Sequence, residues 1–521
     1  MYALLFLLAT LPAADAVEAD VVIRGAKLID GTGKDAVVGD LAIKGERIVA
    51  VGTFEVKGKP KVIDGKGLVV APGFIDLHTH SDDALTQKAT RANLNYLLQG
   101  VTTVVTGNCG AGPADVADYF GKMDEGGIGS NVLHLVPHNT VRRKVMGNVN
   151  RKPSARELEK MAAIVEKGMK DGACGMSTGL IYDPGSYSET DELIALAKVV
   201  ERYGGLYASH IRDEGVGVVG ATEEAIKIGR EAKVAVHVSH MKASGRKAWG
   251  KASDQIAVIL AARKKGQVVT ADQYPYVASS TSLSATVVPA RFREGSRKEY
   301  VSRLDDDKSG PRIRAAIEDS LKSKRDGEDV RIARYAAKPA WQGKSIAAIA
   351  KEEKMKPVEV VLEIERNGGA GIVNFGMSEE DVRLIMKQPF VATASDGSAR
   401  VPDESVPHPR SYGCFPRKIG RYALEDEIVT LEFAVRSCSG LPADILHLPE
   451  RGYLKKGFYA DVVVLDPKTF RDVATFDKPH QYSTGLRYLF VNGKMAVKEG
   501  KFTDVLAGKV IRHKAAKKDE K

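Results

Sequence analysis

The stretch GFIDLHTH (residues 73–80) joins a short apolar run to two histidines at its carboxyl end. Residues two apart on a β-strand point to the same side, so His78 and His80 can bind one ion from the same face of a sheet. A pair of structural histidines would give the same pattern. Whether the pair binds a metal or is structural therefore depends on the residues that end the other strands of the chain.

The middle of the chain repeats this apolar run with helical stretches between the copies. The strand candidates, in order, are GFIDLHTH, GVTTVVTG, NVLHLVP, CGMSTGL, GLYASHI, AVHVSHM, VVTADQYPY and FVATASDG. Helical stretches such as SARELEKMAAIVEKGMK lie between them. Alternating strands and helices predict a parallel sheet, and eight strands are the number that a TIM (β/α)₈ barrel requires. We predict an α/β fold with a barrel over residues 71–440.

Both ends of the chain differ from the middle. Residues 17–70 and 441–505 alternate apolar and polar side chains and are interrupted by Gly, Asp-Gly and Asn-Gly turns. They predict one small β-sandwich domain formed by both termini. Residues 290–388 separate the last two barrel strands and are helical and rich in charge. Because connections of that length are uncommon, we predict an inserted lid subdomain over the barrel mouth.

The N-terminus has the pattern of a secretion signal. Residues 2–13 are apolar but too short to span a bilayer, and Ala14-Asp15-Ala16 resembles a cleavage site. No basic residue precedes the apolar run, which departs from the usual signal. We predict a signal peptide over residues 1–16, export to the periplasm or the medium, and no membrane anchoring after processing. Without a working signal the protein would be cytoplasmic.

Composition excludes several other classes. The 521 residues are 43% hydrophobic and 28% charged, as in a globular protein, with a formal net charge of +10. Residues 506–521 are basic but lack stacking aromatics, so we interpret them as a solvated tail and expect no nucleic-acid partner. The four cysteines form no C-x-x-C pair, which argues against a zinc ribbon and a disulfide scaffold.

Other strands also end in metal-binding residue types. His210 ends GGLYASH, His240 ends VAVHVSH and Asp396 ends FVATASD. Catalytic residues of TIM barrels lie at the carboxyl ends of the strands. The sequence therefore predicts a metal site there. His237 lies three residues before His240, so we expect it to face away from the metal and to be structural.

Cys109 closes TGNCG after the second strand. Glycines on both sides allow a tight turn that presents the sulfur, and a thiolate suits zinc. A small buried hydrophobic side chain is the alternative interpretation of a free cysteine. Cys174 precedes its strand, so we expect it at the opposite end of the barrel from the site, as a packed side chain.

Two further motifs do not fit their usual contexts. Residues 175–179 match G-x-S-x-G, but no histidine and acid follow in the order of an α/β-hydrolase. Residues 215–220 match G-x-G-x-x-G, but the next strand ends in Ser239-His240 where a dinucleotide fold would have an acid. We expect neither a serine hydrolase nor a dinucleotide-binding site.

From about residue 20 to 500 the chain resembles the D-aminoacylase (N-acyl-D-amino-acid deacylase) family of the amidohydrolase superfamily. The resemblance lies in APGFIDLHTHSDD, GVTTVVTGNCG, MSTGLIYDPG, SHIRDEG, VSHMK, YPYVASST, ATASDG, PHPRSYGCFPR and KGFYADVVVLD. TGNCG discriminates, because hydantoinases and dihydroorotases use a carboxylated lysine on the fourth strand as the bridging ligand. Here the fourth strand, GMSTGL, has no lysine. Cys109 on the second strand resembles a replacement for that bridging lysine.

The resemblance implies roles for individual residues. Ligands of a tightly bound zinc would be Cys109, His210 and His240. Ligands of a second, weaker site would be His78, His80 and Asp396, and Asp396 would also be the catalytic acid/base. Substrate and its carboxylate would be bound by Tyr182, Lys242, Tyr276 and Arg410. Met241 stands where some relatives have a second histidine. This departure from the family pattern bears on the details of substrate binding and not on metal binding.

The implied activity is zinc-dependent hydrolysis of a small-molecule N-acyl-D-amino acid to a carboxylate and a free D-amino acid. Two alternatives stay open at this point. The chain could be an amidohydrolase acting on a cyclic amide or an isopeptide, or a metal-free barrel that serves as a scaffold. The sequence leaves open the acyl chain, the side chain, the number of metals in use and the oligomeric state.

Overall fold

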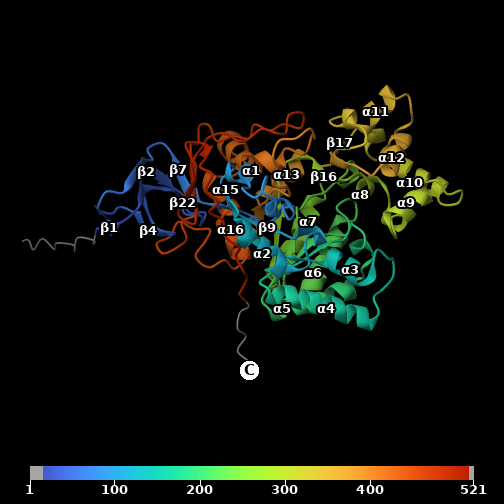
Figure 1. Ribbon diagram of the computed structural model, residues 1–521, viewed down its shortest axis with the longest axis horizontal. Helices are drawn as coiled ribbons and strands as arrows, with labels where there is room; N and C mark the ends of the chain where they lie inside the picture. Colours follow the sequence, from blue (N-terminus) through green and yellow to red (C-terminus); the bar gives the residue numbers. More distant parts are fainter. Residues whose placement is uncertain (1–15, 515–521) are drawn as a thin grey trace, which may run out of the picture.

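The structure, a computed structural model, describes residues 16–514. Figure 1 shows an elongated molecule with a β-sheet at one end, a mixed α/β body in the middle and a mainly helical unit at the other end. The predicted signal peptide lies outside the described residues except for Ala16. Among residues 16–514, no helix is long and apolar enough to cross a membrane.

The predicted barrel strands form two parallel sheets. The first contains β8 (Phe74–Asp76), β9 (Val101–Thr106) and β10 (Asn131–His134). The second contains β11 (Val136–Pro137), β12 (Gly175–Gly179), β13 (Leu206–His210), β14 (Ala235–Val238), β15 (Val269–Gln273) and β19 (Val391–Thr393). Only Leu135 separates β10 from β11, and a parallel bridge joins Thr79 to Gly397 at the other edge. The two sheets therefore meet at both edges.

Five helices, all but α7 clearly amphipathic, cover these strands. They are α4 (Ala155–Lys170), α5 (Thr190–Arg202), α6 (Val218–Ala232), α7 (Ala252–Lys264) and α13 (Glu379–Met386). In α4, Ser154 and Glu157 form a capping box, and Met161, Val165 and Met169 recur every four residues as a buried stripe. Other helices are α1 (Leu94–Leu97), α2 (Val116–Gly126), α3 (His138–Met146), α14 (Arg410–Pro416), α15 (Leu431–Cys438) and α16 (Gly440–Ile445).

Strands from both ends of the chain form one sheet, at the blue end of Figure 1. They are β2 (Val21–Leu28), β3 (Val37–Lys44), β4 (Arg47–Gly52), β6 (Lys61–Asp64), β7 (Val69–Pro72), β20 (Val462–Leu465), β21 (Leu486–Val491), β22 (Lys494–Lys498) and β23 (Lys501–Phe502). The termini join where β7 pairs with β20. We predicted a two-sheet sandwich; hydrogen bonds instead join these strands in one sheet, beside a small β1–β5 pair (Val17–Glu18, Val56–Lys57).

The insertion begins and ends earlier than we predicted. Its antiparallel sheet contains β16 (Ser279–Ser282), β17 (Val330–Arg334) and β18 (Gly371–Asn374). Its helices are α8 (Leu283–Val287), α9 (Arg297–Leu304), α10 (Gly310–Lys322), α11 (Ile346–Glu352) and α12 (Pro357–Arg366), which share their own apolar core. β16 reads SSTS, so no apolar alternation marks its start. At the other end, α13 packs on α7 in the outer helix layer of the parallel strands.

The predicted solvated tail is wrong for its first part. Val132 on β10 donates its N–H to Lys509 O at 3.0 Å, and Ile511 N donates to Val132 O at 2.8 Å. Arg512 forms an ion pair with Asp124 at 2.6 Å. The apolar residues between these basic side chains let the segment dock as an extended strand. Residues 515–521 lie outside the described part of the chain.

Candidate metal centre

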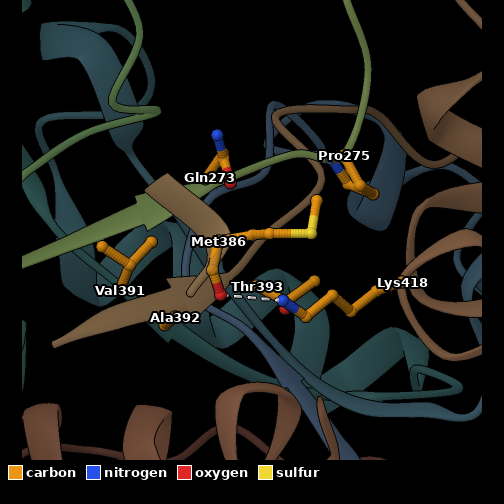
Figure 2. A pocket seen from close by; sticks show the side chains of 7 residues that line it. All are labelled: Gln273, Pro275, Met386, Val391, Ala392, Thr393 and Lys418. Carbon is orange, nitrogen blue, oxygen red and sulfur yellow. Dashed lines mark hydrogen bonds between the residues drawn. The ribbon is translucent and has the colours of Figure 1, made fainter. Parts of the chain in front are cut away.

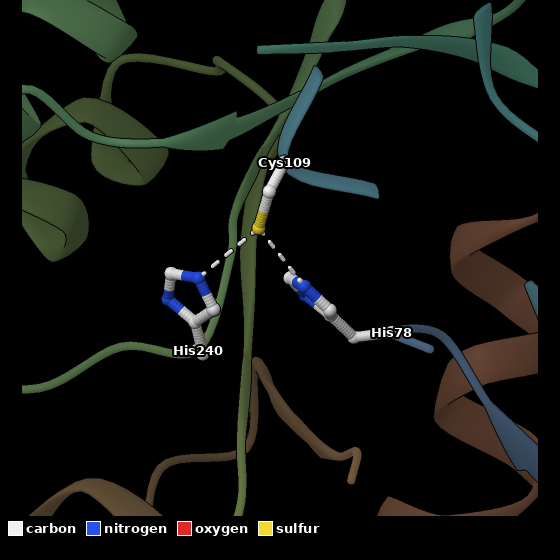
Figure 3. Close-up of side chains that lie close together, drawn as sticks. All are labelled: His78, Cys109 and His240. Carbon is white, nitrogen blue, oxygen red and sulfur yellow. Dashed lines mark hydrogen bonds between the residues drawn. The ribbon is translucent and has the colours of Figure 1, made fainter. Parts of the chain in front are cut away.

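The six predicted ligands come together at the carboxyl ends of the parallel strands. The Sγ of Cys109 lies 3.2 Å from His78 Nε2, 3.5 Å from His210 Nδ1 and 3.4 Å from His240 Nε2. Figure 3 shows Cys109 pointing toward His78 and His240 from a separate segment. All four side chains are buried.

These separations fit a tetrahedral zinc site. Zinc binds sulfur at about 2.3 Å and imidazole nitrogen at about 2.0–2.1 Å, so neighbouring ligand atoms in a tetrahedron are roughly 3.5 Å apart. The three sulfur–nitrogen distances around Cys109 are 3.2–3.5 Å. Soft sulfur together with imidazole is a donor set that zinc prefers. The residues present therefore fit this metal.

A second group lies directly beside the first. His80 Nε2 is 3.0 Å from Asp396 Oδ1, and His78 Nε2 is 3.5 Å from the same oxygen. His78 thus belongs both with Cys109 and His240 and with His80 and Asp396. We predicted two separate ligand sets with His78 in the second. In the structure His78 is at least as close to Cys109 as His210 is, so it bridges the two sets.

Three candidate ligands have backbones in the left-handed region. The φ angles of Cys109, His240 and Asp396 are +52°, +36° and +51°. Such conformations are unfavourable for residues other than glycine and cost on the order of 1–3 kcal/mol each. They persist because surrounding contacts hold them. For His240 one such contact is a hydrogen bond from its N–H to Asp272 Oδ1 at 2.7 Å.

Burial determines the protonation of the ligands. It lowers the pKa of His78 to about 4 and that of His210 well below its usual value. Both imidazoles are therefore neutral near pH 7, as metal binding requires. Burial also raises the pKa of the Cys109 thiol well above its usual value. A thiolate at this position needs a strong nearby cation such as a bound metal.

Two carboxylates that we did not predict, one partly buried and one fully buried, contact the histidines. Glu214 Oε1 lies 3.0 Å from His240 Nδ1, and Glu214 pairs with Lys242 at 2.5 Å. Burial would raise the pKa of Glu214, but Lys242, His210 and His240 lower it well below its usual value, so it stays ionised. Such carboxylates fix the ring orientation of metal-binding histidines. The signal for Glu214 was its position four residues after His210.

The second unpredicted carboxylate is Asp272 on β15. Its Oδ2 lies 3.3 Å from His78 Nδ1 and 2.8 Å from His237 Nε2. His237 therefore faces Asp272 rather than the metal, in accord with the structural role we expected. An acidic residue inside the apolar run VVTADQ was the available signal. Cys174 donates its thiol to His134 O at 3.3 Å and lies in packing.

The predicted substrate-binding residues divide into two groups. Lys242 and Arg410 are buried and contact the ring of Tyr274, with Nζ 5.7 Å and Cζ 4.7 Å from its centroid. Tyr182 packs edge-on against His210, with ring centroids 4.9 Å apart. Tyr276 instead packs against His408, Phe476 and Arg417. The tyrosine of YPY that contacts the candidate site is therefore Tyr274.

Another buried titratable group, Lys418, lies beside Thr393 at the end of β19 and Met386 at the end of α13 (Figure 2). Its Nζ donates to Met386 O at 3.2 Å, and the space around it has no room for a water molecule. Burial lowers the pKa of Lys418 to about 8. None of the described residues that line this space is acidic.

Comparison with known proteins places this geometry in context. A profile of the amidohydrolase family matches residues 61–497. The D-aminoacylase of Alcaligenes xylosoxydans xylosoxydans is 34% identical over 520 residues, covering 95% of this chain and 98% of that protein. The N-acyl-D-glutamate deacylase of the same organism is 35% identical, covering 91% of this chain and 93% of that protein. Its N-acyl-D-aspartate deacylase is also 35% identical, with 92% of each chain covered.

Solved structures of the relatives have a similar fold. A crystal structure of D-aminoacylase is 34% identical, with a TM-score of 0.82, over 95% of this chain and 100% of the other. The N-acyl-D-glutamate deacylase from Bordetella bronchiseptica, complexed with zinc and a phosphonate mimic of the tetrahedral intermediate, is 33% identical with a TM-score of 0.81 and the same coverage. A dihydropyrimidinase from Brevibacillus agri, at 14% identity and a TM-score of 0.57, shares the fold alone.

Proposed function

This chain belongs to the amidohydrolase family and, within it, to the D-aminoacylases, and we propose that it hydrolyses N-acyl-D-amino acids in a zinc-dependent reaction. The products are a carboxylate and a free D-amino acid. The observation that carries the proposal is the position of Cys109 Sγ within 3.5 Å of three imidazole nitrogens. His78, Cys109 and His240 also form a group whose ligand atoms all lie within 4.8 Å of one another, which supports a zinc site at the carboxyl ends of the strands.

Zinc would be held by Cys109 with the surrounding histidines. When bound, it polarises the amide carbonyl and makes water nucleophilic at neutral pH. We propose one tightly bound zinc and a second, weaker position near His80 and Asp396. In support, the D-aminoacylase with a binuclear metal centre is described as activated by one metal and attenuated by the second.

Asp396 is the proposed acid/base. Burial would raise its pKa, but Arg410, His240 and His78 lower it well below the usual value. The carboxylate is therefore ionised and can accept a proton from water at Oδ1. It then passes this proton to the amide nitrogen, which leaves poorly unless it is protonated.

Lys242 and Arg410 are the proposed partners of the substrate carboxylate. Both are buried cations beside the candidate ligands, and a guanidinium can bind a carboxylate through two parallel hydrogen bonds. Their present partners, Glu214 for Lys242 and Asp396 for Arg410, are acids of the same site. Substrate binding would redistribute these contacts.

We further propose that the two parallel sheets are one closed (β/α)₈ barrel and that the insertion is its lid. Closure is supported at both places where the two sheets meet, at Leu135 between β10 and β11 and at the parallel bridge between Thr79 and Gly397. Two contacts support the lid: Ser280 O accepts from Arg410 Nη2 at 3.1 Å, and Thr281 Oγ1 lies 2.9 Å from Tyr182 Oη. Replacing Thr281 by valine should alter the preferred acyl chain, and an unchanged preference would contradict the lid assignment.

Export is also proposed, on the apolar segment at residues 2–13 and the small residues after it. Fractionation of producing cells, with N-terminal sequencing of the recovered protein, tests this. A mature N-terminus near residue 17 outside the cytoplasm is the expected result. An intact N-terminus in the cytoplasm would contradict it.

The test of the activity is a substrate panel. Protein stripped by a chelator is assayed with and without added zinc on N-acetyl-D- and N-acetyl-L-amino acids and on a hydantoin. The panel contains glutamate, aspartate and leucine derivatives, because the three curated relatives are almost equally similar to this chain. Added zinc should restore hydrolysis of the N-acetyl-D-amino acids and not of the N-acetyl-L-amino acids or the hydantoin. Hydrolysis of the hydantoin only, or of none of the amides, would reject the proposal.

A further inference from the structure

We infer that Asp272 is a positioning residue that sets the tautomer of His78, so that the Nε2 lone pair of this ring faces the metal, and that it also holds the backbone of His240. This inference rests on the proposed zinc centre. Asp272 lies on β15 and is completely buried. Its side chain contacts the rings of His78 and His237 and the backbone of His240, so its effect would pass through these histidines.

The carboxylate of Asp272 connects three separate groups. Oδ2 lies 3.3 Å from His78 Nδ1 and 2.8 Å from His237 Nε2. Oδ1 accepts the backbone N–H of His240 at 2.7 Å. Three N–H groups therefore surround this one carboxylate, one from the backbone and two from imidazole rings, which is the environment of a carboxylate that accepts hydrogen bonds.

This geometry dictates where the ring proton of His78 resides. Only a protonated Nδ1 can bond to a carboxylate, and a neutral imidazole carries one proton. The proton therefore sits on Nδ1, and Nε2 keeps its lone pair. Nε2 is the atom that lies 3.2 Å from Cys109 Sγ. Asp272 thus leaves the correct nitrogen of His78 free for a metal.

The same carboxylate restrains His240 through its backbone. His240 has a φ of +36°, which an L-residue adopts only under constraint. The N–H bond to Asp272 Oδ1 fixes the start of this turn, and Glu214 Oε1 contacts the ring at Nδ1. The Nε2 of His240 is left facing Cys109 Sγ at 3.4 Å.

His237 completes the arrangement from the opposite side. Its Nε2 lies 2.8 Å from Asp272 Oδ2, and its Nδ1 lies 2.9 Å from Thr270 Oγ1. The ring also lines a cavity of about 220 Å³ whose other walls include Leu206 and Val236. His237 thereby lies between that cavity and the buried carboxylate.

The decisive variant is Asp272→Asn. Asparagine has the same shape, and its oxygen can still accept from His240 N–H. Its amide group, however, donates where Asp272 Oδ2 accepted. That change forces the proton of His78 onto Nε2 and blocks the lone pair that faces Cys109. We expect the zinc affinity of the folded protein, measured by competition with a chromophoric chelator, to fall about 10–100-fold.

The matched control is His237→Gln. Its amide can still donate to Asp272 Oδ2, so the carboxylate keeps one of its donors and His78 keeps its tautomer. Zinc affinity should stay within about threefold of wild type. A purely structural role for this cluster would instead weaken folding in both variants and leave the zinc affinity of folded protein unchanged.

The tautomer itself provides a readout independent of activity and of any Asp272 variant. Ring-¹⁵N histidine labelling of the metal-free wild type, with His78 assigned by its absence in His78→Gln, should show Nδ1 protonated. Nε2 protonated in the wild type, or wild-type zinc affinity in folded Asp272→Asn, would overturn the inference. Failure of the wild type to hydrolyse any acyl-amino acid would reject the proposed function but leave this measurement intact.

Discussion

Arg410 Nη1 lies 2.7 Å from Asp396 Oδ2, and both side chains are almost completely buried. The candidate acid/base is therefore paired with a permanent cation that belongs to the proposed substrate pocket. This pairing keeps Asp396 ionised. It also joins the proposed substrate-binding residue Arg410 directly to the proposed acid/base Asp396.

Replacing Asp396 by asparagine removes the proton acceptor without changing its shape. We expect kcat to fall by about 10²–10⁴-fold, the usual contribution of a general acid–base group. Steady-state kinetics on the preferred N-acyl-D-amino acid, with zinc content measured in parallel, test this. If the variant retains zinc and most of the wild-type rate, Asp396 does not carry the proton.

Replacing Arg410 by glutamine should change the pH profile. Arg410 lowers the pKa of Asp396, so its loss raises that pKa toward and beyond the usual value. Because Asp396 must be ionised to act, activity on the acid side should disappear about 1–3 pH units higher than in wild type. KM for substrate should also rise. The measurement is kcat/KM against pH.

Arg417→Gln is a matched control for that experiment. Arg417 is also a largely buried cation, but it pairs with Asp472 and stacks on Tyr276. Its loss should leave the acid limb of the profile in place. An equal displacement of the acid limb in both variants would contradict the role given to Arg410.

Replacing Cys109 by serine should release the metal. A hydroxyl is a much poorer zinc ligand than a thiolate, and Cys109 lies at the centre of the candidate ligands. We expect the zinc affinity to fall by more than about 100-fold, a larger loss than for residues that act through a ligand. Cys174→Ser, in the same Cys-Gly context but bonded to His134 O, should keep its zinc. Metal analysis after dialysis distinguishes the two.

Lys418 provides a prediction about stability. Its folded-state pKa of about 8 is below the model-peptide value of 10.5, so the unfolded chain binds more protons between these values. Stability therefore increases as pH rises from 8 to 10.5. Below pH 8 the buried ammonium destabilises the fold by up to about 3 kcal/mol. Lys418→Met should melt at a higher temperature than wild type at pH 7.

That gain should shrink toward pH 10.5, where wild-type Lys418 is neutral in the folded and the unfolded state alike. Thermal denaturation at pH 7 and pH 10 compares the two proteins. Arg263→Met controls for the loss of a partly buried cation that donates to a backbone carbonyl, since Arg263 Nη1 donates to Val269 O at 2.6 Å. A lower melting temperature for Lys418→Met at pH 7 would show that the amine stabilises the fold.

Much of the site could be predicted from the sequence because barrel ligands follow apolar runs at fixed places. His78, His210, His240 and Asp396 all end such runs, and the structure brings them together. Cys109 needed more than periodicity, since its turn is specified by neighbouring glycines and by the family resemblance. The predicted roles of these residues in metal binding and catalysis stay predictions until they are measured.

Other features left little trace in the sequence. Glu214 and Asp272 each had a local signal, but their contacts with His240 and with His78, 194 residues away from Asp272, are tertiary and could not be read from it. Tyr274 and Tyr276 are two residues apart in an irregular segment, so spacing alone could not decide which faces the site. The strand at 279–282 is entirely polar, and the docked strand near Ile511 was hidden among basic residues.

The pairing of β7 with β20 has a consequence for biosynthesis. β7 directly precedes β8, the first parallel strand, yet its hydrogen-bonded neighbour is almost four hundred residues away in the chain. Contacts between such distant segments form slowly. A nascent chain must therefore present its early strands with one edge unpaired until the ribosome has released residues beyond Leu465. Until then that edge is available for pairing with other chains, and any nonsense mutation before β20 leaves it open.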